Sequence, residues 1–430
     1  MRNKVLFIVL IFLLTVGAWV ITFLTNNSKE DRFISIKAQV KENEELGIYK
    51  KNIALYKELI SMEKENIQWY EKLADSYYHL EKYGDYENAC MDIIKAFPED
   101  ALGYIKLGEY YRQNGRVDEV IELYSSLPES IKEDKTLKAL YEKSEFEYTY
   151  RGSTCDEIIP FLSYLTVVRK GESYIYVDYT GSQAFEREYD LARPFIEDMA
   201  AVFYDNEWYM IDKEGDKIAA TKELVQDLYS ISEGYAVAKF NGMYGYVDEN
   251  FKKFHIEYDN ATNFYNNVAA VQVNGKWKLI SKEFKDITDA IYDEIIVDEN
   301  NICTRGGVIF AKKGENYHML NLSGKEITNE VFEDARIFVS KEPVAVKKNG
   351  KWGFIDTEGK KVIDFKYDDA YSFSLGLAPV CIDGIWGYID QKEEMKVPRI
   401  FDESKPFYKT GIAVVKYGNT YRFIQLIKYE

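Results

Sequence analysis

Five aspartates recur at the same point of a repeated phrase, and regularly spaced carboxylates of this kind could serve as metal ligands. They are Asp178, Asp212, Asp248, Asp356 and Asp390. Calcium requires six to eight oxygen ligands, and one carboxylate in about 35 residues is too sparse to supply them. Three other copies of the phrase carry Ser281, Asn321 or Gln425 instead. We therefore expect these side chains to cap the following turn by accepting backbone N–H groups.

Signatures of catalysis are otherwise scarce. The chain has 72 acidic residues, so paired carboxylates of the glycosidase type must occur, but the sequence marks no pair above another. Its 3 histidines and 4 cysteines are scattered and include no C-x-x-C pair for zinc. G-x-S-x-G, P-loop, H-E-x-x-H and dinucleotide-binding motifs are all missing from the sequence. We expect no catalytic residue, no metal ligand and no cofactor-binding residue.

The charge of the chain limits its partners. The formal net charge is −17, whereas binding to nucleic-acid phosphates requires clustered Lys and Arg. We therefore expect no nucleic-acid partner. Only 8 residues are proline and 46% are hydrophobic, which indicates folded domains without long disordered linkers.

An aromatic phrase organises the C-terminal two-thirds of the chain. Its clearest copies are KWGFID from Lys351 and IWGYID from Ile385. The aromatic residues at the repeated position of eight copies are Tyr174, Trp208, Tyr244, Trp277, Tyr317, Trp352, Trp386 and Tyr421. A second landmark keeps the same phase and consists of an aromatic residue, an acid, four residues and another aromatic, as in FDESKPF from Phe401. One step is longer than the others, with its extra residues near DENNICTRGG, after Tyr292.

Each copy has the pattern of a three-strand meander. The alternating run GLAPVCI reaches Asp383-Gly384, a two-residue hairpin signal, and WGYID returns as the next strand. One meander cannot bury enough apolar surface alone, so the copies must pack on one another. We expect an open or spiral β-array over residues 155–430. A closed, propeller-like ring is the alternative, although about 35 residues is short for a four-stranded blade.

These units resemble the WG-repeat family, also called KWG repeats, which occurs in bacterial surface and periplasmic proteins. The resemblance extends over residues 155–430 and is strongest at Trp352-Gly353 and Trp386-Gly387. The glycine is replaced in five copies, by Ile175, Tyr209, Lys278, His318 and Arg422. The family implies an interaction module without catalytic residues. We interpret the recurrent aromatic residue as core shared between units; a groove that stacks sugars is the alternative.

Residues 31–150 have a helical period. The sharpest unit is marked by Tyr104, Leu107, Gly108, Tyr111 and Gly115. Its larger side chains share one helix face, the first glycine lets a neighbouring helix come close, and the second closes the turn. This unit resembles a tetratricopeptide repeat (TPR), and residues 70–96 form a looser copy. The resemblance implies a small helical stack with a groove for a partner's peptide; a rigid spacer is the alternative.

An apolar run lies near the N-terminus. Residues 5–24 contain no charge, and a helix of this length would cross a hydrocarbon core of about 30 Å. We expect residues 1–30 to form a transmembrane signal-anchor of a single-pass cell-membrane protein. Arg2 and Lys4 favour a cytoplasmic N-terminus and an extracytoplasmic body. A cytoplasm-facing body is the alternative.

The sequence thus predicts an α+β multi-domain protein with an anchor at 1–30, a TPR-like domain at 31–150 and eight WG-type β-repeats at 155–430. The expected function is non-catalytic binding or scaffolding at a bacterial membrane, with a protein or cell-envelope polymer as ligand. A polysaccharide-acting enzyme and a cytoplasmic adaptor are the alternatives. The repeated residues build the domain, so a ligand would contact residues that differ between copies, and the sequence does not identify which.

Overall fold

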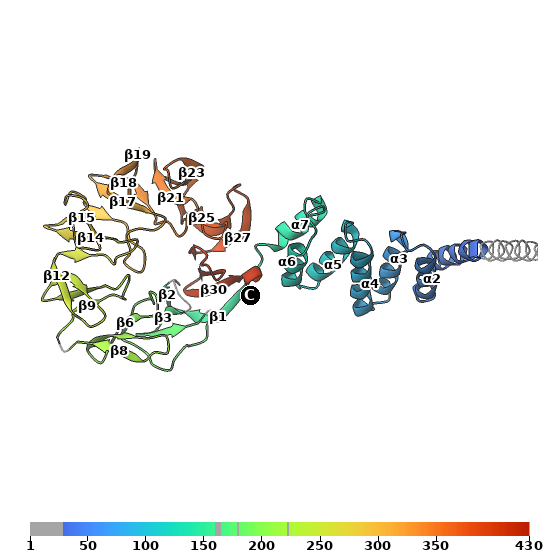
Figure 1. Ribbon diagram of the computed structural model, residues 1–430, viewed down its shortest axis with the longest axis horizontal. Helices are drawn as coiled ribbons and strands as arrows, with labels where there is room; N and C mark the ends of the chain where they lie inside the picture. The colour runs from blue at the N-terminus through green and yellow to red at the C-terminus, as the bar shows by residue number, and fades with distance from the viewer. Residues whose placement is uncertain (1–28, 160–164, 179, 222, 430) are drawn as a thin grey trace, which may run out of the picture. The chain divides into compact units, whose positions relative to one another are not determined.

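The computed structural model describes residues 29–159, 165–178, 180–221 and 223–429 (Figure 1). The chain divides into two compact units, one ending at Glu145 and the other running from Phe146. Within the described ranges, no helix is long and apolar enough to cross a bilayer, so the predicted single-pass membrane localisation is wrong for this part of the chain. The apolar run of residues 5–24, which carried that prediction, lies outside the described residues.

The N-terminal unit is helical. Residues 29–45 are helical, and the following helices are α2 (Tyr49–Met62), α3 (Ile67–His79), α4 (Tyr83–Ala96), α5 (Ala101–Gln113), α6 (Val117–Ser125) and α7 (Lys135–Ser144). Side chains of Asn66, Asp100 and Asp134 accept backbone N–H groups at the starts of α3, α5 and α7. Such caps are lacking on α4 and α6, which follow short turns. This alternation fits a stack of helical hairpins.

The TPR-like positions lie in and directly after α5. Leu107 is fully buried and Tyr104 nearly so, whereas Tyr111 is half-buried. A Cβ atom added to Gly108 would lie 2.5 Å from Cδ2 of Leu140 on α7, so the close helix approach requires a glycine. Gly115 has a φ of +72° in the turn before α6, a conformation that favours glycine.

The C-terminal unit contains eight antiparallel sheets that follow one another around a ring (Figure 1). Their strands are β2 (Glu157–Ile159), β3 (Thr166–Lys170) and β4 (Ser173–Val177); β5 (Leu191–Ala192), β6 (Ala200–Tyr204), β7 (Glu207–Ile211) and β8 (Lys217–Ala220); β9 (Asp227–Leu228), β10 (Ala236–Phe240), β11 (Met243–Val247) and β12 (Lys253–Tyr258); β13 (Asn260–Ala261), β14 (Val268–Val273) and β15 (Lys276–Ser281); β16 (Glu294–Ile295), β17 (Val308–Lys313), β18 (Asn316–Asn321) and β19 (Glu326–Phe332); β20 (Asp334–Ala335), β21 (Val344–Lys348), β22 (Lys351–Ile355) and β23 (Lys361–Tyr367); β24 (Asp369–Ala370), β25 (Ala378–Ile382), β26 (Ile385–Ile389) and β27 (Met395–Phe401); and β28 (Glu403–Ser404), β29 (Ile412–Tyr417), β30 (Thr420–Leu426) and β1 (Tyr148–Cys155).

Each sheet begins with a short inner strand that the three-strand prediction missed. In the sheet ordered β24-β25-β26-β27, this strand is only Asp369–Ala370, within the second landmark. Two residues are too few to produce a detectable alternation. The outer strands β12, β19 and β23 lie at the rim of the ring in Figure 1. In the two sheets with three strands, isolated bridges such as Tyr174–Tyr189 and Trp277–Tyr292 stand in place of the outer strand.

The ring is closed, so the predicted open or spiral array is wrong and the propeller-like alternative holds. Strand β1 pairs antiparallel with β30, from Tyr148 opposite Leu426 to Cys155 opposite Tyr421. The last sheet therefore combines the first strand of this unit with its last three. Closure leaves no unpaired sheet at either end and packs apolar residues of the first and last sheets in one cluster. The sequence did not indicate the pairing of β1 with β30, because YTYRGSTC of β1 contains no repeat phrase.

The aromatic phrase forms the third strand of each sheet. Trp352 lies opposite Tyr367, and Trp386 lies opposite Phe401, so the two aromatic landmarks face each other across neighbouring strands. Of the eight phrase aromatics, Trp208, Tyr317, Trp352 and Trp386 are buried, and Tyr174, Tyr244, Trp277 and Tyr421 are half-buried.

The recurring aspartates cap turns. Oδ1 of Asp356 accepts hydrogen bonds from the backbone N–H groups of Glu358 and Lys360, both at 2.9 Å. The same pair of bonds is made by Asp178, Asp212, Asp248 and Asp390, and by the side-chain oxygen of Asn321. Because an amide oxygen accepts these bonds as well as a carboxylate does, the pattern reflects turn capping.

Candidate functional site

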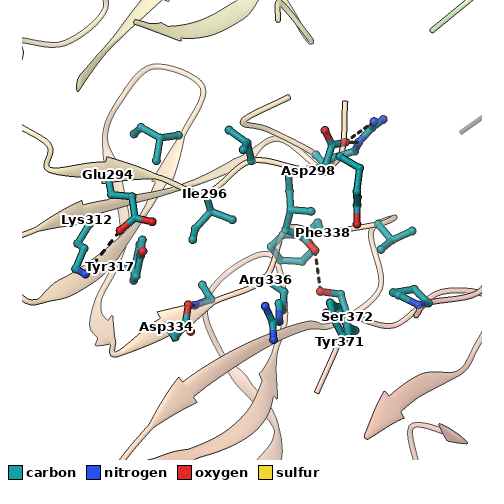
Figure 2. A pocket seen from close by; sticks show the side chains of 18 of the residues that line it. Glu294, Ile296, Asp298, Lys312, Tyr317, Asp334, Arg336, Phe338, Tyr371 and Ser372 are labelled. Atoms are coloured by element: carbon teal, nitrogen blue, oxygen red, sulfur yellow. Dashed lines mark hydrogen bonds and ion pairs between the residues drawn. The ribbon is translucent and has the colours of Figure 1, made fainter. Parts of the chain in front are cut away.

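A cavity of about 560 Å³ lies on the inner side of the ring, a typical size for a ligand pocket (Figure 2). Four consecutive sheets contribute to its wall, each through the segment that follows its inner strand. Its main lining residues are Ile296, Asp298, Glu299 and Arg305 after β16, Arg336 and Phe338 after β20, Tyr371 and Ser372 after β24, and Pro406 and Tyr408 after β28.

Part of the wall comes from a position that varies between repeats, because Ile296, Arg336 and Tyr371 occupy it. This position is the fifth residue of the second landmark, at the end of the inner strand or directly after it. Around the ring its occupants are Ile159, Arg193, Tyr229, Thr262, Ile296, Arg336, Tyr371 and Lys405. The landmark residues on either side repeat because they form the core, whereas this position changes in size and charge from sheet to sheet.

Tyrosines of the repeat phrase hold the backbone of this variable position. The hydroxyl of Tyr388 on β26 donates to the backbone oxygen of Lys405 at 2.8 Å, in the next sheet. Tyr176 and Tyr246 make the same bond to the backbone oxygens of Arg193 and Thr262. All three rings are fully buried. In these three sheets the variable position is thus fixed through its main chain.

Cations contact aromatic rings along the wall. The Arg336 guanidinium lies over the rings of Trp352 and Tyr371, at 4.6 and 4.4 Å from their centroids. The Lys405 ammonium donates to the Tyr371 hydroxyl at 2.6 Å and pairs with Glu403 at 2.8 Å. Burial acts to lower the pKa of Lys405, but Tyr371 and Glu403 outweigh it, so the net pKa is raised and the ammonium stays charged.

The longer step in the repeat forms a loop, residues 298–305, that enters the cavity wall. Oδ1 of Asp298 accepts the backbone N–H groups of Asn300 and Ile302, both at 2.9 Å. Oδ2 of Asp298 accepts from Nε and Nη2 of Arg305 at 3.0 and 2.7 Å. The Arg305 guanidinium also lies over the Tyr265 ring, 4.6 Å from its centroid. The ends of the loop are thereby tied to each other.

The neighbouring sheet holds the same loop from the other side. The side-chain amide of Asn263 donates to the backbone oxygen of Asn300 at 2.9 Å, and that of Asn301 donates to the backbone oxygen of Ala261 at 2.9 Å. A backbone bond of 2.7 Å joins Asn263 to Asn301. These contacts fix the backbone on both sides of Glu299.

Glu299 is the acidic group that this loop presents to the cavity. Its side chain is open to the solvent of the cavity but enclosed by protein on most sides, and this enclosure raises its pKa. A hydrogen bond from its own backbone N–H lowers the pKa, as do the positive charges of Lys405 and Arg305, while Asp298 raises it further. Among the described residues, no other side chain forms a hydrogen bond or ion pair with the Glu299 side chain, and the donor to its carboxylate is its own backbone N–H.

The sequence predicts the core residues that support this site but not the residues that line the cavity. Of the eight phrase aromatics, Tyr317 is the one that contributes to the described lining. The residues that line the wall, including Arg336 and Tyr371, occupy the four middle positions of the second landmark, for which the sequence indicates no role. The longer step after Tyr292 was the available signal for Glu299, since a length change in a regular repeat marks a loop with its own role.

The fold and the cavity define the class: an eight-bladed β-propeller with a variable, charged inner wall. The family model described as "WG containing repeat" matches four stretches of this unit, residues 176–208, 244–277, 352–384 and 386–421. These matches confirm the resemblance for those four stretches. No curated protein matches the chain.

Several solved structures have a similar arrangement at low identity. Hsv2 of Kluyveromyces lactis is 9% identical, with 58% of this chain and 94% of that chain covered and a TM-score of 0.36. A eukaryotic initiation factor is 11% identical, with coverages of 66% and 87% and a TM-score of 0.42. The WD40 domain of Neurospora crassa Pan2 is 11% identical, with coverages of 45% and 71% and a TM-score of 0.29. The assignment of a closed ring rests on the pairing of β1 with β30.

Proposed function

We propose that this protein is a non-catalytic scaffold that binds a polypeptide ligand with the inner wall of its propeller. The observation that carries the proposal is the difference between the repeated and the variable positions of the second landmark. Residues that build the ring repeat from sheet to sheet, whereas the variable position carries isoleucine, arginine or tyrosine where it lines the cavity. A surface that varies on a constant frame is suited to recognition.

The chemistry of the wall supports a polypeptide as the ligand. Arginine and tyrosine dominate the binding energy of many protein interfaces, and here Arg336 and Tyr371 contact each other in the cavity wall. Their contacts with Lys405 and Asp369 hold both side chains in place before a ligand arrives. Such preorganisation lowers the entropic cost of binding. The WG matches agree with this role, because the family resemblance implies an interaction module.

A displayed library of random peptides, selected on the full chain, tests the proposal. We expect enriched peptides whose affinity, measured by fluorescence anisotropy, falls about tenfold or more in Tyr371→Ala, as for a hot-spot residue. Tyr417→Ala is the matched control, because Tyr417 is 64% exposed at the tip of the β29–β30 hairpin and does not line the cavity. Equal affinities of the two variants, or selection of no peptide, would contradict the proposal. If soluble cell-wall polysaccharide is the only competitor for the site, the ligand is a polysaccharide and not a polypeptide.

A further inference from the structure

The residues at the variable position follow a pattern with a period of four sheets. With β2-β3-β4 counted as the first sheet, the types are isoleucine, arginine, tyrosine and threonine in sheets one to four, and isoleucine, arginine, tyrosine and lysine in sheets five to eight. The residues are Ile159, Arg193, Tyr229 and Thr262, followed by Ile296, Arg336, Tyr371 and Lys405. Three of the four types therefore recur in the same order.

The closed ring places the two copies of this pattern on opposite sides. In a ring of eight sheets, two sheets that are four apart in order are separated by half a turn. Figure 1 shows β6 and β9, which belong to the second and third sheets, across the ring from β21 and β25, which belong to the sixth and seventh. The inner wall thus has an approximate two-fold axis along the centre of the ring.

The two arginines make the same ion pair with the next sheet. Nη2 of Arg336 donates to Oδ1 of Asp369 at 2.9 Å, and Nη2 of Arg193 donates to Oδ1 of Asp227 at 2.8 Å. The two arginine side chains also keep similar exposed fractions, 30% and 26%. Both guanidinium groups are therefore oriented in the same way and remain open to solvent.

The aromatic contacts of the two arginines also match. The guanidinium in the sixth sheet lies 4.4 Å from the ring centroid of Tyr371 and 4.6 Å from that of Trp352. The guanidinium in the second sheet lies 4.2 Å from the ring centroid of Tyr229 and 5.7 Å from that of Trp208. In both cases the tyrosine belongs to the next sheet and the tryptophan to the repeat phrase of the same sheet. The cation and its two aromatic neighbours are thus repeated as a unit.

A buried serine after each tyrosine fixes the junction between the two sheets. The hydroxyl of Ser372 donates to the backbone oxygen of Ile337 at 2.7 Å, and that of Ser230 donates to the backbone oxygen of Pro194 at 2.7 Å. Each of these backbone oxygens belongs to the residue that follows the arginine. Both Arg–Tyr pairs are therefore held in the same arrangement by the main chain beneath them.

A tie between neighbouring sheets is the structural alternative for these contacts. Such a tie would serve at every junction of the ring, yet the other six junctions lack an arginine followed by a tyrosine at the variable position. The pair formed by Arg336 and Tyr371 lines the cavity of about 560 Å³. Its repetition at the opposite junction therefore indicates a second place for the same kind of ligand.

We propose that Arg193 and Tyr229 form a second binding subsite for the same polypeptide segment that Arg336 and Tyr371 bind. The proposal rests on the proposed function and specifies its partner, a polypeptide that presents this segment twice, as a two-fold symmetric dimer does. Once one copy is bound, binding of the other is intramolecular, so such a partner binds more tightly than a single segment.

The two subsites differ in the residue that follows the tyrosine around the ring. Lys405 donates to the hydroxyl of Tyr371 and so holds that ring in place. The hydroxyl oxygen of Thr262 instead accepts the backbone N–H of Ala270 at 2.8 Å. We therefore expect the subsite of Tyr371 to be the better preorganised and the tighter of the two.

Isothermal titration calorimetry of the full chain counts the subsites. The probe is the most enriched peptide of the library selection, as a synthetic monomer. We expect two peptides per wild-type chain, the second bound at least about tenfold more weakly than the first. Tyr229→Ala should keep only the tighter event, Tyr371→Ala only the weaker one, and the double variant neither. Tyr417→Ala is the control and should keep both.

A covalent dimer of the same peptide tests for the two-fold partner. With flexible Gly/Ser linkers of several lengths, the best dimer should bind one chain at least about tenfold more tightly than the monomer, and Tyr229→Ala should remove this gain. Tyr229→Leu is a second variant, which keeps apolar volume but removes the aromatic ring. Near-ultraviolet circular dichroism identifies a variant that fails to fold.

The outcomes separate this inference from the proposed function. If one peptide binds, and Tyr371→Ala abolishes binding while both Tyr229 variants leave it unchanged, the scaffold stands and the second subsite falls. If two peptides bind and both remain in folded Tyr229 variants, the second peptide lies elsewhere and this inference falls. If the dimer binds no more tightly than the monomer at any linker length, the dimeric partner falls. If no peptide binds, both proposals fall.

Discussion

A chain that begins at Asp156, and so lacks β1, is expected to lose cooperative folding of the propeller, whereas a chain that begins at Phe146 is expected to keep it. The two differ by ten residues and both lack the helical unit. Without β1 the outer edge of β30 is unpaired along its length, and the buried side chain of Cys155 leaves the cluster that joins the first and last sheets. We expect the free energy of unfolding to fall by at least about 4 kcal/mol, because the loss of a whole paired strand exceeds the effect of most single substitutions.

Thermal unfolding followed by near-ultraviolet circular dichroism measures this difference. The chain from Asp156 should also associate at high concentration, because an unpaired edge strand is a template for further pairing. Addition of a peptide of residues 146–155 should restore the transition, and a scrambled peptide should not. Equal melting curves for the two truncated chains would mean that the ring does not depend on β1 for closure.

Substitution of the WG glycines by alanine is the second large effect that we expect. At Gly387, Trp386 pairs with Phe401 and Tyr388 pairs with Val397, so the outer strand β27 has two extra residues opposite this glycine. A Cβ atom on Gly387 would lie 2.8 Å from both the backbone nitrogen of Arg399 and the backbone oxygen of Val397. Because these are main-chain atoms, they can move away only by distorting the strand.

We expect Gly387→Ala to destabilise the protein by roughly 1–3 kcal/mol, as for other overpacked sites. Gly353→Ala should behave alike, since a Cβ there would lie 2.9 Å from the backbone oxygen of Ile363. Gly84→Ala in α4 is the control, because no atom lies within 4 Å of the added carbon and alanine favours a helix. Urea denaturation measures the free energy of unfolding of each variant. If both glycine-to-alanine variants were as stable as wild type, the backbone of the outer strand would move away from the added Cβ atom at little cost.

The same geometry explains why the glycine is not kept in every copy. Four sheets have two extra outer-strand residues at this point; Gly245, Gly353 and Gly387 occupy it in three of them, and Arg422 occupies it in the fourth, opposite β1. His318, which replaces the glycine in another copy, pairs directly with Val331 on β19. A side chain is accommodated there because no bulge lies over it. The outer strand thus accounts for the replacement by His318, whereas nothing in the structure explains the one by Arg422.

The sequence was sufficient to locate the eight sheets, because each phrase aromatic and its partner in the second landmark must meet across two strands, as Trp352 and Tyr367 do. Closure could not be predicted, since β1 has no repeat phrase and its partner β30 is recognised only in three dimensions. The cavity wall was also out of reach. Nothing in Arg336 or Tyr371 distinguishes them from core residues until the inner strand that precedes each of them is known.

The pairing of β1 with β30 also has a consequence for synthesis of the chain on the ribosome. Arg151 and Gln425 form a side-chain hydrogen bond of 2.9 Å across 274 positions of sequence. Strand β1 leaves the ribosome before any other strand of the ring, and its partner leaves last. Contacts of such separation form slowly, so the intermediate sheets must assemble while the first strand waits unpaired. A nascent propeller is therefore incomplete until β30 emerges, and a chain interrupted before β30 exposes an open edge to chaperones and proteases.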